Sequence, residues 1–232
     1  MKSRHLFAIA FFGFLATSQA DLTIEQKVDG AGGIHKLTLK VKGDKARVDI
    51  NPQISTIIDA KTGDVTTLLH DKKTIMRVSG EKAKAMAEMA KSFAKEETPE
   101  QAVPKATGKK ETINGYETDE YVTDSAKYHA SYWVAKNYPN YENILKQMMI
   151  MQQGAFAALT KGMPDYHILP GLPLRTEIKV PGQEDVTSTI ESLKTDFLLE
   201  SDFAIPAGYS EMKMPDFLGG KQPSDKPDPG NE

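Results

Sequence analysis

Six short segments of alternating apolar and polar residues follow one another in the first part of the chain. Within residues 34–42, for example, Leu37, Leu39 and Val41 share one face, and polar residues, mostly lysines, share the other. A period of two is typical of a strand that buries one face, so the pattern predicts antiparallel strands. The predicted strands are residues 22–28, 34–42, 45–50, 55–60, 65–70 and 74–78. Short turns join them, and such a meander curls toward a barrel or half-barrel.

The period changes to that of a helix in two other segments. Residues 80–96 and 141–161 each place apolar side chains three or four positions apart. This spacing predicts two amphipathic helices. The first presents Met86, Met89 and Phe93, and the second presents Met148, Met151 and Phe156.

Further alternating segments follow each predicted helix. They are residues 108–113, 116–123, 127–136, 174–180 and 185–197. Asn114-Gly115 is a strong hairpin signal, because both residues tolerate the positive φ of a type I′ turn. The whole pattern predicts an α+β fold with a single strongly curved antiparallel sheet of about 10–11 strands, an incomplete barrel. The two main helices are expected against its concave face.

The two ends of the chain differ from the rest. Residues 1–20 combine basic residues, a short apolar run and small residues before Asp21, which is the pattern of a cleaved secretory signal peptide. The expected protein is therefore periplasmic or secreted and has no membrane anchor. Residues 219–232 contain no apolar side chain, which predicts a disordered acidic tail. The folded domain is expected over residues 21–218.

Composition excludes several classes of chemistry. The sequence has no cysteine, so disulfides, thiol catalysis, zinc–thiolate sites and the lipid anchor of a lipoprotein are ruled out. The net charge is −3. A mildly acidic protein is poorly suited to bind nucleic acid, so no nucleic-acid partner is expected.

No residue pattern typical of an enzyme or a metal site is present. The histidines that follow the signal segment are His35, His70, His129 and His167. None lies three or four residues from another, whereas a metal site needs three or four converging ligands. The serine and glycine patterns of hydrolases and nucleotide-binding proteins are also absent. The chain is therefore predicted to be no enzyme, with no catalytic residue, no metal and no cofactor.

Four segments of the chain resemble a known family when they are taken together. They are GKKETINGYETDEY (108–121), YWVAK (132–136), GLPLRTEIKV (171–180) and SDFAIPAGYSEM (201–212). Their order and spacing resemble a domain-of-unknown-function family of secreted bacterial proteins, grouped with the LolA/LolB-like superfamily of periplasmic lipoprotein carriers. The resemblance implies an incomplete barrel with helices against its concave side, which holds acyl chains in LolA-like carriers. The chain has no arginine that matches the lid-locking arginine of LolA.

Two functional hypotheses follow for the apolar helix faces. In the first, the protein is a non-enzymatic periplasmic binding or carrier protein, and its partner is a lipid or the acyl chain of a lipoprotein. Methionine suits this role because its flexible thioether adapts to varied apolar shapes. The candidate cavity-lining residues are Met86, Met89, Phe93, Met148, Met151 and Phe156. In the second, a structural or protein-interaction domain of the cell envelope has a filled core and no ligand. The ligand and the oligomeric state stay open.

Overall fold

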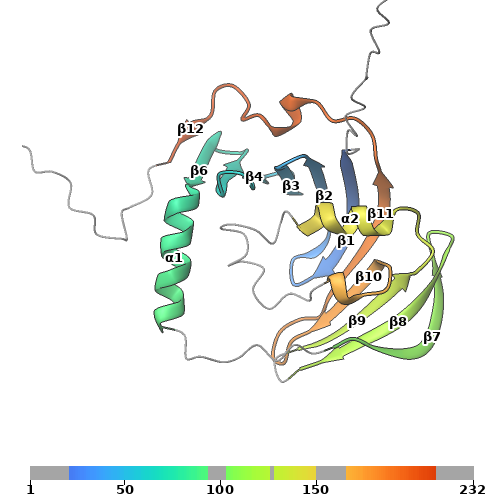
Figure 1. The fold of residues 1–232 in the computed structure, drawn as a ribbon. Coiled ribbons are helices and arrows are strands. Elements are labelled where there is room, and N and C mark those ends of the chain that lie inside the picture. Colours follow the sequence, from blue (N-terminus) through green and yellow to red (C-terminus); the bar gives the residue numbers. More distant parts are fainter. Residues whose placement is uncertain (1–20, 94–102, 126–127, 150–165, 213–232) are drawn as a thin grey trace, which may run out of the picture.

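Twelve strands form one continuous, open sheet. The computed structural model describes residues 21–93, 103–125, 128–149 and 166–212. The strand order across the sheet is β12-β6-β5-β4-β3-β2-β1-β11-β10-β9-β8-β7. The strands are β1 (Leu22–Gly30), β2 (Gly33–Lys42), β3 (Lys45–Asn51), β4 (Ile54–Asp59), β5 (Asp64–Leu69), β6 (Thr74–Val78), β7 (Lys105–Ile113), β8 (Tyr116–Asp124), β9 (His129–Ala135), β10 (Leu172–Lys179), β11 (Val186–Lys194) and β12 (Ser210–Glu211). Within the described residues, the end strands β12 and β7 do not pair, so the sheet is an incomplete barrel (Figure 1).

The cross-strand register of the first six strands builds one continuous apolar surface. Successive residues of a strand point to opposite faces, and directly opposite residues of neighbouring strands share a face. One such row runs from β1 to β6 through Leu22, Val41, Ala46, Ile58, Val65 and Val78. Every member is apolar. Helix α2 (Tyr141–Met148) lies inside the arc and packs against this row, so this is the concave face (Figure 1).

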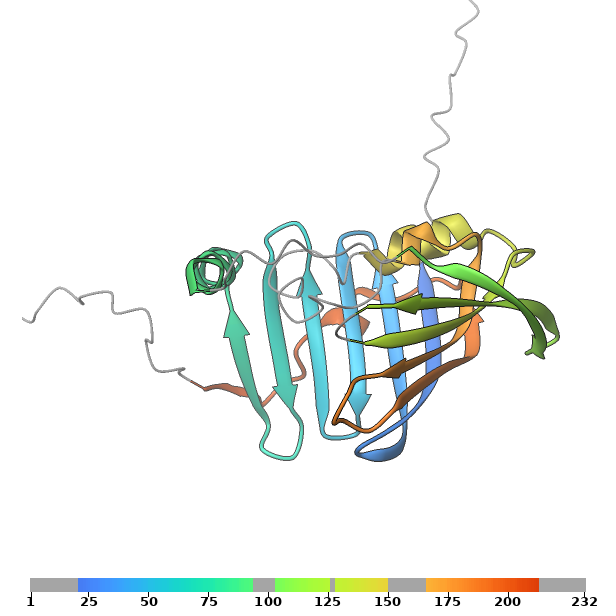
Figure 2. The same cartoon turned by 90° about the horizontal axis from the view of Figure 1, so that it is seen from below.

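The later strands extend the sheet in a different direction. β11 pairs with β1, and β10, β9, β8 and β7 follow outward in turn. Figure 2 shows these strands crossing the direction of the first six. Among the strand pairs that include these later strands, the register shifts between Glu25 and Gln26, between Pro173 and Arg175, and between Ala106 and Lys110. Irregularities of this kind bend a strand and increase its twist, which accounts for the strong curvature.

The two helices occupy different places on the arc. α1 (Gly80–Phe93) begins just after β6 and lies at that edge of the sheet (Figure 1). α2 lies over the other side of the arc, near β1 and β10 (Figure 1). Its Ile144 and Leu145 side chains are buried. A short 3-10 helix, η2 (Tyr166–Ile168), precedes β10.

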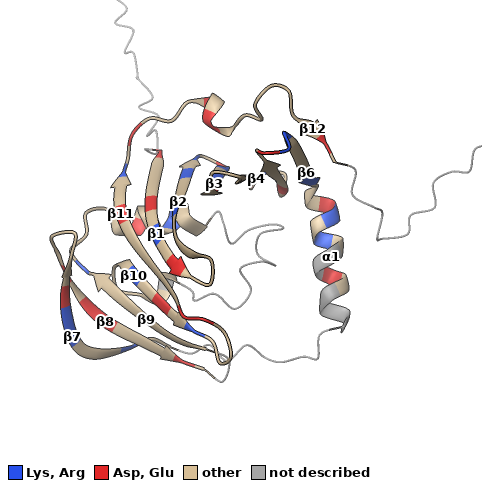
Figure 3. Ribbon diagram, turned by 180° about the vertical axis from the view of Figure 1, so that it is seen from behind, with Lys and Arg blue, Asp and Glu red and all other residues tan. Residues whose placement is uncertain are grey.

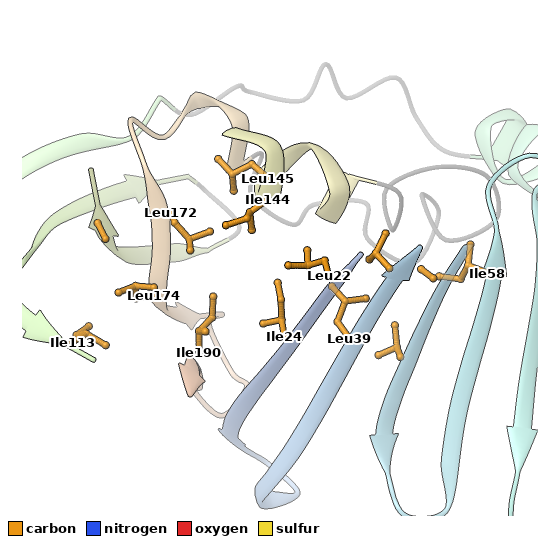
Figure 4. Packing of buried hydrophobic residues seen from close by; sticks show 14 of the residues in the cluster. Leu22, Ile24, Leu39, Ile58, Ile113, Ile144, Leu145, Leu172, Leu174 and Ile190 are labelled. Atoms are coloured by element: carbon orange, nitrogen blue, oxygen red, sulfur yellow. The ribbon is translucent and has the colours of Figure 1, made fainter. Parts of the chain in front are cut away.

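One hydrophobic cluster joins α2 to both halves of the sheet (Figure 4). Leu22 and Ile24 come from β1, Ile144 from α2, Leu172 from β10 and Ile190 from β11. All five are at most 4% exposed. Full burial of a side chain of this size stabilises the fold by about 1.5–3 kcal/mol. The cluster therefore fixes α2 and the start of β10 relative to the first strands.

The C-terminal segment, residues 198–212, crosses the convex face and is called the strap below. It contains η3 (Glu200–Phe203) and β12, and it buries Leu198 and Phe203 (Figure 1). The acidic residues of η3 bind basic residues of the strands beneath it (Figure 3). The strap therefore closes the convex side of the first six strands.

The structure agrees with most of the predicted elements and adds one. The α+β class, the single curved sheet and the incomplete barrel are confirmed. The predicted hairpin is also confirmed, since Asn114 and Gly115 have φ values of 52° and 83° between β7 and β8. The added strand is β12, which is parallel to β6 and only two residues long. Two residues carry too little alternation to predict a strand. Residues 150–161 of the second predicted helix and residues 219–232 lie outside the described residues.

Candidate functional site

The concave face of β4, β5 and β6 presents apolar side chains that are not fully covered. Ile54 of β4 lies opposite Leu69 of β5. In the neighbouring row, Thr56 lies opposite Thr67, and Thr67 lies opposite Met76 of β6. Ile54, Leu69 and Met76 are each partly exposed. Apolar side chains gathered on one face of a soluble protein mark an interaction or ligand-binding surface when water still reaches them.

The same face carries no charge along its first two rows. The row beginning at Leu22 is entirely apolar. The next row contains Ile24, Leu39, Val48, Thr56, Thr67 and Met76. An uncharged surface of this composition suits hydrocarbon, because burial of apolar area contributes about 25 cal/mol per Å².

The predicted helix residues are distributed over separate parts of the arc. Met148, in the last turn of α2, is partly buried against the main core cluster. Met89, in α1, has 48% of its side chain exposed. Met86 and Phe93 lie in α1, where only their backbone is described, and Met151 and Phe156 lie outside the described residues. Helices α1 and α2, which carry Met89 and Met148, lie at different places on the arc (Figure 1).

Sequence reasoning missed the strand residues of this face as candidate ligand contacts. Leu69 and Met76 belong to two of the predicted strands. The predicted cavity-lining residues were all taken from the helices, because methionines cluster there. The same alternation could have identified them, since it places Ile54, Leu69 and Val78 on the inward side with the core residues.

A row of polar and aromatic residues crosses the later strands. Another row of opposite residues runs from β8 to β11 through Tyr121, Tyr132, Thr176 and Ser188. Ser188 lies opposite Val28 of β1, whereas Tyr132 packs with Ala130, Val134 and Leu169 in a cluster separate from that of Leu22 and Ile24. Tyr132 is completely buried, and burial raises the pKa of its hydroxyl above the ordinary value. The phenol therefore keeps its proton at any physiological pH.

A hydrogen-bonded network on the convex face contains a serine and a histidine. Ser55 Oγ lies 2.5 Å from Asp49 Oδ1 and 2.7 Å from His70 Nε2, and Tyr209 OH lies 2.6 Å from His70 Nδ1. Because Asp49 can only accept, Ser55 donates to it, and His70 must then donate from Nε2 to Ser55. In a nucleophilic pair the histidine instead accepts the serine proton. The Ser55–His70 pair therefore does not have the arrangement of a nucleophile and its base. It holds the strap through the bond between His70 and Tyr209.

His129 and His35 show no sign of a metal centre. His129 lies 2.6 Å from Asp124, and His35 lies 3.4 Å from the backbone oxygen of Gly33. Across the part of the chain that the structure describes, no group of three or more His, Asp or Glu residues could hold a metal ion. Within the same ranges, no helix is long and apolar enough to cross a membrane.

The fold and the site together define a class of protein. It is an open curved sheet with a largely apolar concave face and a convex face that the strap crosses. The chain belongs to a domain of unknown function family, DUF4412, whose family model matches residues 21–209. The resemblance drawn from the sequence to such a family is thereby confirmed. No curated protein matches the chain.

Several solved structures are distantly similar. The chain matches PNGF-II with a TM-score of 0.38 and 16% identity, over 83% of its own length and 31% of that chain. It therefore spans about a third of PNGF-II. It matches a DUF1329 family protein from Desulfovibrio piger with a TM-score of 0.33 and 12% identity, covering 82% of this chain and 91% of that one. A LolA superfamily protein from Nitrosomonas europaea gives a TM-score of 0.31 and 10% identity, with 81% and 91% covered. All three TM-scores lie below 0.5, so these likenesses say nothing about function.

Proposed function

We propose that this protein is a non-enzymatic carrier that holds an apolar ligand, such as a lipid or an acyl chain, between its curved sheet and its helices. The observation that carries the proposal is the partly exposed apolar surface of Ile54, Leu69 and Met76 on the concave face. A monomeric fold gains stability by covering such side chains, as the strap does on the other face of the same strands. Leaving them accessible suits a face that a ligand covers.

The absence of charge on this face supports a hydrocarbon ligand. Ionised groups lose their hydration on burial, so a cavity for acyl chains is expected to exclude them. The two rows that begin at Leu22 and Ile24 contain only apolar residues and two threonines. Broad affinity for different chain shapes is therefore expected, with little stereospecificity.

Titration with a fatty acid that carries a terminal dansyl group tests the proposal. Saturable binding with a rise in dansyl fluorescence is expected for the wild type. Leu69→Ser, on the concave face, should weaken binding. Ile57→Ser is the matched control, because Ile57 is also partly exposed but faces the convex side with Arg47. Absence of probe binding by the wild type would overturn the carrier proposal.

A second candidate is a structural or protein-interaction domain with a filled core. The packing of α2 favours it, because Ile144 and Leu145 are only 1% and 4% exposed within the core cluster. Under this alternative, Met148 is also a packing residue. Met148→Ala should then lower the free energy of unfolding by about 2–5 kcal/mol. A much smaller loss, together with weaker dansyl-probe binding, is expected if Met148 borders a ligand.

The proposed place of action is outside the cytoplasm, in the periplasm or the medium. Residues 1–20 support it, because their pattern is that of a signal peptide cleaved before Asp21. Asp21 itself has a structural role, since its carboxylate accepts the backbone N–H of Leu198 at 2.8 Å. N-terminal sequencing of protein from its native envelope should begin at Asp21. An intact N-terminus in the membrane fraction would contradict this location.

A further inference from the structure

Two large apolar side chains point outward where the chain leaves β11 and enters the strap. Phe197 is 78% exposed and Leu199 is 59% exposed, whereas Leu198 between them is buried. An extended chain directs alternate side chains to the same side, so Phe197 and Leu199 form one small apolar surface, called the rim patch below. Neighbouring apolar side chains that stay in water are a candidate interaction site.

The backbone beneath the rim patch is fixed by contacts with the sheet. The backbone N–H of Leu198 donates to the Asp21 carboxylate at 2.8 Å. Lys42 Nζ lies 4.3 Å from the centroid of the Phe197 ring, and an ammonium over an aromatic face is attractive. The fold therefore holds the two side chains in their exposed positions.

The rim patch lies at the end of the sheet where the apolar concave face begins. Lys42, which lies over the Phe197 ring, directly follows Val41 of the first apolar row. Asp21, which holds the start of the strap, directly precedes Leu22 of the same row. Figure 1 shows the chain leaving β11 at this end, beside β1. A surface that covers the rim patch is therefore close to the end of the concave face.

The charges around the rim patch are balanced. Lys42 lies 3.4 Å from Glu200 and 3.9 Å from Asp21, and Lys45 lies 2.9 Å from Glu200. These two cations and two carboxylates sum to zero. Asp196, directly before the patch, is exposed and adds a negative charge. A zwitterionic partner therefore suits the patch, whereas an anionic surface would be repelled.

The size of the rim patch also limits its partner. A stable protein interface buries about 800 Å² on each side, from about 20–30 residues. Two side chains fall far short of that. A membrane surface requires less, because each apolar side chain that enters the boundary between headgroups and acyl chains contributes separately.

We propose that Phe197 and Leu199 insert into the surface of a zwitterionic lipid bilayer and dock the carrier on the membrane with which it exchanges its ligand. This inference rests on the proposed carrier function and names a partner for it. Hydrocarbon chains are unfavourable in water, so a protein that holds one takes it from an apolar phase and returns it to one. Docking through the rim patch brings the end of the concave face to that phase. The contact is reversible, because two side chains are too few for a stable anchor.

Sedimentation with sucrose-loaded vesicles of phosphatidylethanolamine and phosphatidylcholine tests the inference. The wild type should sediment with the vesicles. Phe197→Ser and Leu199→Ser should each lower the partition coefficient by about tenfold, which corresponds to about 1.4 kcal/mol. Ile34→Ser is the matched control, because Ile34 is 63% exposed but lies opposite Asp29, at the other end of β1. It should bind vesicles like the wild type.

A tryptophan at the rim patch reports insertion directly. Phe197→Trp keeps an aromatic ring in an exposed position. Its emission should shift to shorter wavelength on vesicles and should be quenched by brominated phosphatidylcholine. Ile34→Trp is the control, and its emission should not respond to the vesicles. Trp133, the single native tryptophan, contributes the same background to both variants.

The outcomes separate this inference from the carrier proposal. Without vesicles, Phe197→Ser should bind the dansyl probe like the wild type. If the wild type binds vesicles through the rim patch but not the dansyl probe, the carrier proposal is wrong and membrane docking is confirmed. If it binds the dansyl probe but no vesicles, or if Phe197→Ser and Leu199→Ser bind vesicles like the wild type, the docking inference is wrong.

Two further results would assign the rim patch to another partner and overturn the inference. One is vesicle binding that requires anionic phosphatidylglycerol. The other is a dimer of the wild type, detected by analytical ultracentrifugation, that Phe197→Ser abolishes.

Discussion

The two faces of the first six strands are built from the same segments, but neighbouring apolar residues on them differ in exposure. On the convex face, Leu68 and Ile75 are 0% and 5% exposed, on the side that the strap crosses. On the concave face, Leu69 and Met76 remain partly exposed although each is adjacent in sequence to one of these buried residues. The strap therefore crosses one face, while Leu69 and Met76 keep some exposure on the other. The carrier proposal rests on this difference.

Paired polar groups also hold the convex face. Lys40 lies 2.7 Å from Asp202, and His70 lies 2.6 Å from Tyr209. A satisfied network of this kind stabilises a fixed arrangement.

Truncation of two neighbouring leucines should give the largest contrast between the faces. Leu68→Ala leaves a cavity beneath the convex cover and should lower the free energy of unfolding by about 2–5 kcal/mol. Leu69→Ala removes a side chain that is already partly exposed, so the loss should be well below that of Leu68→Ala. Urea denaturation of both variants measures the difference. Equal losses would show that the concave face is packed as tightly as the convex one.

Replacement of His70 tests how firmly the strap is held. His70→Phe keeps a ring of similar size but removes the bonds to Ser55 and Tyr209, so a loss of about 1–3 kcal/mol is expected. Hydrogen exchange within residues 198–212 should accelerate, while exchange in β1 should not. Tyr209→Phe is the milder control, because it removes only the outer bond of the two. Unchanged exchange in the strap would mean that this network does not hold it.

The turn between β7 and β8 provides a reference for backbone strain. Gly115 has a φ of 83°, and no atom lies within 4 Å of a Cβ placed on it. Gly115→Val should therefore lower stability by about 1–3 kcal/mol through strain alone. Dansyl-probe affinity should be unchanged, and the denaturation midpoint measures the strain. A variant as stable as the wild type would refute the type I′ turn.

The smallest expected effect is a loss of stability in acid, because the ion pair between Asp202 of the strap and Lys40 is then lost. The hydrogen bond from Lys40, and then that from the Leu199 backbone, hold the pKa of Asp202 below its ordinary value of 3.8. Its contribution is therefore complete above that ordinary value and is lost as the pH falls through the lower pKa of the folded state. The loss should be about 0.5–1 kcal/mol, the scale of a partly exposed ion pair.

The pH dependence is checked by comparing denaturation midpoints at pH 7 and pH 2 in two variants. Asp202→Asn should lose this part of the dependence because it cannot ionise. Asp29→Asn, at an exposed end of β1, should retain it. Identical pH profiles for Asp202→Asn and the wild type would show that ionised Asp202 does not stabilise the docking of the strap.

Much of the fold could be predicted because its signals are local. Alternation of the kind seen in residues 34–42 requires a half-buried strand, and Asn114-Gly115 requires a tight turn, whatever the rest of the chain does. The pairing of β11 with β1 could not be predicted, because it joins residues more than 150 positions apart, such as Gln26 and Ile190. Sequence spacing carries no information about such a contact.

The candidate site was less predictable than the fold for a related reason. Period-two alternation says that Leu68 and Leu69 face opposite sides, but it does not say which side the chain later covers. The segment that crosses the convex side, residues 198–212, lies far along the chain, and Leu68 on that side is fully buried. The complete burial of Tyr132 likewise depends on side chains from distant segments, such as Leu169 and Tyr166.

The sequence by itself therefore determined the local elements, the absence of thiol chemistry and the family, because each depends on residue types and their short-range order. Only the tertiary structure decided which face is closed by the strap and which keeps apolar surface. It also decided that Ser55 and His70 form a hydrogen-bonded network with Tyr209 of the strap. These outcomes depend on contacts between distant segments, and burial and hydrogen bonding are properties of such contacts.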